Sequence, residues 1–186
     1  MAKKNEFVER DDPHLFTTSS GKQIRLSLFP PLQMQMMQDA AGKEAAKLYG
    51  EAVRPTYTTS ADEVMPHDES TLETDEDRAA WAKYQGILNK HTTHVGEKTM
   101  RFVLFYGVDM NPDDDPDWQA RQQFFGIEIP DDPIGRKIHY IQTEFIYTRA
   151  DIEEIMYRIA EMSGVRREVI DASAATFSDS TRDTGT

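Results

Sequence analysis

Helix start signals in the second half of the chain constrain the fold more than any other feature of the sequence. Asp132 precedes Pro133, an order typical of an aspartate N-cap followed by a proline at the first helical position. Thr148 and Asp151 have the spacing of a capping box. We therefore predict helices over about 118–125, 132–145, 148–163 and 166–177, the first three with tight connections and the first ended by Gly126.

Two further helices are expected in the first half. Residues 32–53 are rich in helix formers, although Gly42 could interrupt the helix. A second helix is expected to begin after Thr74, which can form a capping box with Asp77, and to continue to Met100. The apolar residues 101–108 either end that helix or form a buried strand, and their periodicity does not decide between the two.

Two short segments have the character of strands. Residues 22–29 alternate between polar and apolar side chains and stop at a pair of prolines. Residues 54–59 contain a proline, which disfavours helix in the residue before it, and threonines, which favour strand. These two segments could pair with each other and lean on a helix.

The predicted fold class is therefore mainly α (α+β), with a small two-stranded β element near the N-terminus. We expect one helical domain over residues 22–177. Residues 1–21 are polar and are predicted to form an N-terminal arm, and residues 178–186 a flexible tail.

The negative charge of the chain is concentrated in two stretches. The net charge is −12, and residues 61–77 contain eight carboxylates with no Lys or Arg. Residues 109–133 contain eight carboxylates against Arg121 alone. We interpret 61–77 and 109–117 as solvated acidic loops. Such stretches repel phosphates, so direct nucleic-acid binding is not expected.

Several classes of protein and of site are not expected. The chain has no cysteine, which excludes disulfides, thiol nucleophiles and cysteine-bound zinc. No apolar run reaches the length of a membrane span, and residues 1–10 lack the apolar stretch of a signal peptide. We therefore predict no membrane association, and a protein that stays in the compartment where it is made.

Catalytic and metal-binding patterns are incomplete. His91, His94 and Glu97 could share a helical face, but the zinc-protease pattern requires glutamate at residue 92, which is threonine. Residues 109–113 imitate the start of a calcium loop, but its sixth and twelfth positions are Asp114 and Ala120. No glycine-rich phosphate loop or Gly-x-Ser-x-Gly motif is present. The prediction is a non-enzymatic protein with no cofactor and no metal site.

Methionines and aromatic residues instead indicate protein binding, with an ordinary core as the alternative explanation. If residues 32–37 are helical, Met34 and Met37 share a face and Met36 lies nearly opposite, so one face is expected at or near the surface. Aromatic residues beside loops or acidic segments are further candidates. The predicted partner-binding residues are Leu32, Met34, Met36, Met37, Tyr57, Trp118, Phe124 and Phe125.

A series of short segments resembles a known family. They are RPTY at 54–57, PHDE at 66–69, a helix start with Trp81 and Tyr84, GV at 107–108, GIEIP at 126–130, HYI-x-TE at 139–144, DIE at 151–153 and SGV at 163–165. Over roughly residues 5–177 the chain is similar to small acidic proteins encoded among the tail morphogenesis genes of tailed bacteriophages. Members are similar to tail assembly chaperones in size, acidity and helical content.

The resemblance implies binding to other phage proteins in the host cell cytoplasm. A tail assembly chaperone would coat the hydrophobic helices of the tape-measure protein until tail-tube subunits displace it. The alternative is a structural component of the tail or neck that stays in the virion beside neighbouring subunits. A second alternative, without a viral link, is a cellular protein-binding adaptor. A homo-oligomer is compatible with each of these roles.

Overall fold

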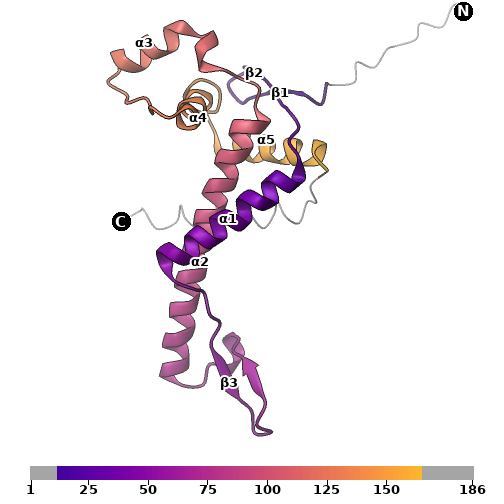
Figure 1. Cartoon of the computed structure of the whole chain (residues 1–186), viewed down its shortest axis with the longest axis vertical. Coiled ribbons are helices and arrows are strands. Elements are labelled where there is room, and N and C mark those ends of the chain that lie inside the picture. The colour runs from indigo at the N-terminus through magenta and orange to yellow at the C-terminus, as the bar shows by residue number, and fades with distance from the viewer. Residues whose placement is uncertain (1–11, 165–186) are drawn as a thin grey trace, which may run out of the picture. The chain divides into compact units, whose positions relative to one another are not determined.

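The computed structural model describes residues 12–164, which form five α-helices, two short 3-10 helices and two antiparallel two-stranded sheets (Figure 1). The mainly α fold with a small β element near the N-terminus is therefore confirmed. The predicted helix over 166–177, the tail over 178–186 and residues 1–11 of the predicted arm lie outside the described residues.

By its internal contacts the described chain falls into two compact units, each with its own elements. Unit 1 comprises residues 12–31 and 101–164, and unit 2 comprises residues 32–100. The expectation of one helical domain over residues 22–177 stays a prediction. The helix α2, Asp75–Gly107, contributes residues to both units. No break in the sequence pattern marks the boundary, because the chain stays helical across it.

Unit 1 begins with a hairpin of β1 (Leu15–Thr17) and β2 (Gln23–Arg25), in which Phe16 lies opposite Ile24 and both side chains are buried. The sequence-based pairing of residues 22–29 with 54–59 is wrong, because β2 pairs with a segment assigned to the arm. The hairpin closes a much shorter loop, which costs less chain entropy than the distant pairing.

The segment 101–108, for which two structures were left open, ends the helix. α2 continues to Gly107, and Val108 then forms a single antiparallel bridge with Leu26. The backbone N–H of Ser27 donates to the carbonyl of Gly107 at 2.8 Å, which extends this contact. The end of α2 is thereby attached to the hairpin strand.

The three predicted helices of the second half are present as α3 (Pro116–Phe124), α4 (Pro133–Glu144) and α5 (Arg149–Met162). Asp132 caps α4 through a 2.7 Å hydrogen bond to the N–H of Gly135, and Thr148 and Asp151 form the predicted capping box of α5. α3 begins two residues earlier than expected because Asp115 is its N-cap.

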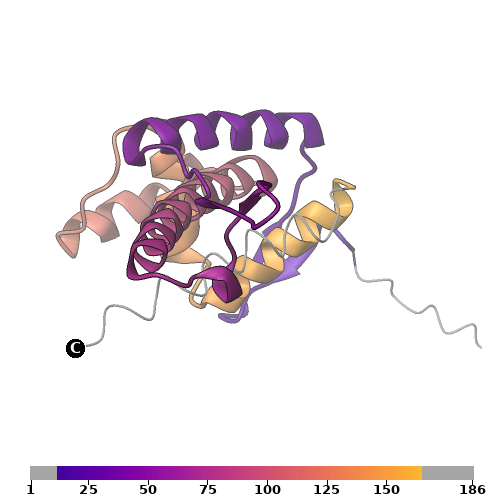
Figure 2. The same ribbon diagram turned by 90° about the horizontal axis from the view of Figure 1, so that it is seen from below.

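Asp151 also attaches α5 to the hairpin. Its carboxylate accepts hydrogen bonds from the N–H of Ser19 at 2.7 Å and from the Ser19 hydroxyl at 2.6 Å. Two turns further along α5, the guanidinium of Arg158 lies 5.3 Å from the ring centroid of Phe16. Figure 2 shows α5 beside the hairpin strands accordingly.

Unit 2 contains α1 (Pro31–Tyr49), most of α2, and a hairpin of β3 (Thr56–Thr58) and β4 (Val64–Pro66). α1 is continuous through Gly42, so the interruption considered there is absent. Part of the expected acidic loop over 61–77 is ordered as β4 and the 3-10 helix η1 (Glu69–Thr71). The N-terminus of α2 has the predicted capping box between Thr74 and Asp77.

α1 and α2 are joined by polar contacts within unit 2. The carboxylate of Glu44 lies 3.2 Å from Nζ of Lys98 and 3.4 Å from Nε2 of His94. Nε2 of His91 lies 2.7 Å from the carbonyl oxygen of Gly50, at the end of α1. Of the two histidines that suggested a metal ligand pair, His91 therefore contacts the end of α1 and His94 lies beside Glu44 of α1.

Candidate partner-binding surface

The eight residues predicted to contact a partner differ widely in exposure. Four are exposed: Leu32, Met36, Phe124 and Phe125. Tyr57 and Met37 are half-buried. Trp118 and Met34 are buried, so the structure assigns these two to the interior instead of to a surface.

Trp118 is a core residue of unit 1. Its side chain is fully buried, and its ring lies 5.0 Å from the ring of Tyr140 in an edge-to-face arrangement. The indole N–H donates to Oγ1 of Thr143 at 3.3 Å, which satisfies its polar atom. Its position next to acidic residues in the sequence suggested a surface role, but on a helix the residue can point away from that charged face.

The ring of Tyr57 already contacts another residue of unit 2. Its ring packs 4.8 Å from the ring of His67, which is buried. Nδ1 of His67 lies 3.1 Å from Oγ1 of Thr71, and Arg54 donates to the His67 carbonyl at 2.7 Å. Tyr57 therefore helps to fix the β3–β4 hairpin on η1.

The α1 surface consists of Leu32 and Met36, which are one turn apart and about two-thirds exposed. Met34, on a different face of α1, is buried. The prediction that one of the two methionine faces lies at the surface is therefore confirmed, and the exposed one carries Met36.

The α3 surface lies on the exposed side of α3 and the turn that follows it. It consists of Asp117, near the start of α3, and of Phe124, Phe125 and Ile127 at its end. Phe124 is 84% exposed and Phe125 is 70% exposed, and their rings are 5.4 Å apart in an edge-to-face arrangement. Ile127 is 41% exposed. Two adjacent aromatic rings with this exposure form an apolar surface that water contacts in the free chain, which is typical of binding sites.

A rigid turn holds the α3 surface in place. Gly126 has φ +69°, a conformation that favours glycine. The N–H of Gly126 donates to the carbonyl of Gln123, and the N–H of Ile127 to that of Gln122. This pair of bonds is the Schellman arrangement of a helix end. On the other face of α3, Trp118 and Gln122 are buried, so the aromatic pair is directed to solvent.

The charge beside the aromatic pair is negative. Asp117 lies two turns before Phe124 on the same exposed face. Arg121 lies between them, but its guanidinium is 2.8 Å from Asp115 and 3.3 Å from Glu144. The hydrogen bond with Asp115 and the charge of Glu144 raise the pKa of Arg121. Its positive charge is therefore already compensated.

Ile127 and Asp117 were not identified from the sequence, although a signal for each exists. A Schellman end places an apolar residue directly after its glycine, which fits Ile127. A spacing of seven residues places Asp117 and Phe124 on one helical face. Neither signal identifies a binding residue unless the buried face of α3 is known.

One ionisable group elsewhere in unit 1, Lys137 of α4, contacts the end of α2. Lys137 is half-buried and donates to the carbonyl of Phe105 at 2.7 Å, near the end of α2. Burial lowers the pKa of its ammonium, and the charge of Asp109 opposes this shift. Within residues 12–164, no three His, Asp or Glu side chains are grouped as a metal ion would require.

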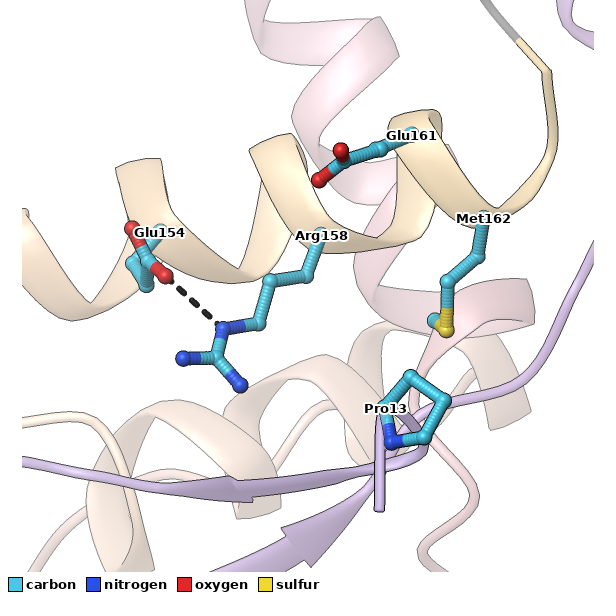
Figure 3. Close-up of a pocket in the computed structure, with 5 residues that line it drawn as sticks. All are labelled: Pro13, Glu154, Arg158, Glu161 and Met162. Carbon is cyan, nitrogen blue, oxygen red and sulfur yellow. Dashed lines mark hydrogen bonds and ion pairs between the residues drawn. The ribbon is translucent and has the colours of Figure 1, made fainter. Parts of the chain in front are cut away.

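A hollow of about 440 Å³ lies along α5 (Figure 3). Figure 3 shows Arg158 turned toward Glu154, to which Nε donates at 2.7 Å, while Met162 extends toward Pro13. The positive charge of Arg158 is therefore paired with Glu154 within the chain. The residues lining the hollow are Pro13, Glu154, Arg158, Glu161 and Met162. We place the candidate site on the α3 surface instead, because within residues 12–164 the rings of Phe124 and Phe125 contact no aromatic ring except each other and no cation.

In the part of the chain from 12 to 164, no helix combines the length and the apolarity needed to cross a bilayer. Comparisons of the chain with protein-family models, with curated proteins and with solved structures gave no match. The resemblance to tail morphogenesis proteins therefore stays a prediction from the sequence.

Proposed function

We propose that this chain is a non-enzymatic bacteriophage morphogenesis protein that binds other phage proteins during tail assembly. In this role it acts like a tail assembly chaperone in the host cytoplasm, shielding tape-measure helices. The observation that carries the proposal is the exposed Phe124–Phe125 pair on a rigid glycine turn. Aromatic residues on a preorganised support contribute most to binding energy at protein interfaces.

The charge of the chain supports a shielding role. An exposed apolar surface is an aggregation risk unless the protein repels its own copies. The net charge of −12 supplies that repulsion and would keep a complex with an apolar client in solution.

The alternative role is a structural component of the tail or neck. One observation favours it: each unit has an exposed apolar surface of its own, the α1 surface in unit 2 and the α3 surface in unit 1. Two such surfaces would allow a subunit to contact two neighbours in a particle.

Co-expression with fragments of the accompanying tape-measure protein tests the proposal. We expect the fragments to become soluble and to co-purify with the chain. Phe124→Ser/Phe125→Ser should reduce their recovery, whereas Leu28→Ser, another exposed apolar residue of unit 1, should not. Fragments that stay insoluble with and without the chain would contradict the chaperone role. Stoichiometric recovery of the chain by mass spectrometry of mature particles would favour the structural role.

A further inference from the structure

We infer that the α3 surface binds a basic amphipathic helix of the partner, with apolar residues against Phe124 and Phe125 and Lys or Arg side chains beside them. The inference rests on the proposed function, because it names the partner chemistry of the same surface. Two independent observations carry it: exposed carboxylates on α3 and after its glycine turn that form no ion pair within residues 12–164, and aromatic rings that lack a cation there.

The carboxylates around the pair have few positive charges to neutralise them. Residues 109–133 contain eight carboxylates and one arginine, which is already bound to Asp115 and Glu144. Asp117 lies on the exposed face of α3, and Glu128 and Asp131 follow the glycine turn. All three are exposed, and within residues 12–164 none of them forms an ion pair. A partner with Lys or Arg would neutralise these charges as the apolar contact forms.

The aromatic rings of this chain repeatedly carry a cation. Lys137 lies 5.2 Å from the ring centroid of Phe105, and Lys22 lies 5.2 Å from that of Phe145. In unit 2, Arg54 lies 5.5 Å from the Trp81 ring. Neither Phe124 nor Phe125 has such a cation among the described residues. A partner cation over these rings would gain the same attraction.

The shape of the surface favours one helix. Phe124, Phe125 and Ile127 are exposed within four consecutive positions at the end of α3, and a single apolar stripe of i and i+4 side chains is long enough to cover them. Nucleic acids and anionic membranes would be repelled by the carboxylates. A second copy of the chain would bring the same carboxylates together.

The inference is tested with the full chain and two synthetic amphipathic peptides of about five helical turns. The peptides share one leucine stripe and differ in their polar face, which carries Lys and Arg in one and Glu in the other. Calorimetric titration should show the basic peptide binding at least about ten-fold tighter. Raising the salt from about 50 to 300 mM should weaken its binding several-fold.

Three variants locate the binding site. Phe124→Ser/Phe125→Ser should lower the affinity for the basic peptide at least about ten-fold. Asp117→Asn/Glu128→Gln/Asp131→Asn should remove most of the preference between the peptides. Leu28→Ser, an exposed apolar residue of unit 1 that belongs to neither candidate surface, should leave the affinity within about two-fold.

The inference is overturned if the peptides bind equally, if the basic peptide does not bind, or if the phenylalanine variant binds it unchanged. Binding to phosphatidylglycerol vesicles, or a dimer that the phenylalanine variant dissociates, would also overturn it. The two proposals fail separately. If the basic peptide binds but tape-measure fragments do not, the inference stands and the proposed function fails. If the fragments are kept soluble but the peptides bind equally, the proposed function stands alone.

Discussion

Unit 1 and unit 2 are stabilised in different ways. Of the buried apolar residues in the described chain, sixteen belong to unit 1 and three, Met34, Ala41 and Ala45, to unit 2. Burial of large apolar side chains is the main stabilising contribution in folding. Unit 1 therefore has a core of the usual kind, whereas unit 2 depends on other contacts.

Polar and aromatic contacts take a larger part in unit 2. His67 is buried and lies between the Tyr57 ring, Thr71 and Asp77, with Nε2 3.5 Å from Oδ1 of Asp77. Glu44 joins α1 to α2 through His94 and Lys98. Such contacts fix the orientation of elements but add less stability than a core. We therefore expect unit 2 to open locally while unit 1 stays folded.

A substitution in the core of unit 1 is expected to give the largest loss of stability. Trp118→Ala removes a fully buried indole and should lower the free energy of unfolding by about 3–5 kcal/mol. Urea unfolding followed by circular dichroism measures the loss. Phe124→Ala, on the exposed face of the same helix, is the control and should change it by less than about 0.5 kcal/mol. Equal effects would remove the distinction between core and surface on α3.

Breaking the attachment of α5 to the β1–β2 hairpin is expected to give the second-largest loss of stability. Asp151→Ala should cost about 2–3 kcal/mol, because it removes the N3 half of the capping box and leaves the N–H of Ser19 unpaired. Asp151→Asn keeps an acceptor and should cost less. A destabilisation of unit 2 as large as that of unit 1, seen by hydrogen exchange, would contradict the separation of the units.

The pH dependence of the same carboxylate has a defined sign. Burial tends to raise the pKa of Asp151, but hydrogen bonds from Ser19 and Thr148 outweigh it and leave the pKa lowered. The stabilisation is therefore fully present above the ordinary aspartate pKa and is lost as the pH falls through the lower folded-state pKa. Urea titrations of wild type and Asp151→Asn should converge as the pH is lowered across that range.

The hairpin of unit 2 gives a smaller and local effect. Tyr57→Ala removes the ring against His67 and should destabilise the β3–β4 hairpin by about 1 kcal/mol. Amide exchange over residues 55–67 should accelerate by several-fold. Thr56→Ala, an exposed neighbour, is the control. Faster exchange throughout unit 1 would show that the two units do not open independently.

Two glycines with opposite backbone requirements give the smallest effects. Gly126→Ala should cost about 1 kcal/mol, because the left-handed backbone at φ +69° disfavours a side chain. Gly86→Ala, inside α2 with open space around the position of a Cβ, should stabilise by about 0.5–1 kcal/mol. Thermal unfolding of both variants checks the opposite signs. Gly126→Ala should also weaken partner binding, because it loosens the support of the α3 surface.

Local signals predicted most of the helices. Asp132 with Pro133, Thr148 with Asp151, and Thr74 with Asp77 each place a cap within a few residues of the helix it starts. Such signals depend on hydrogen bonds between near neighbours in the chain, so they can be read without the tertiary structure. The strand pairing failed because the alternation of residues 22–29 indicates a strand but does not identify its partner.

The sequence by itself determined the helical class, the helix starts and the concentration of negative charge, because these depend on neighbouring residues and on composition. Only the tertiary structure decided which apolar residues are free. It buried Trp118, engaged Tyr57 with His67 and left Phe124 and Phe125 in solvent. The physical reason is that a helix has several faces, and the sequence does not specify which face packs on residues far along the chain.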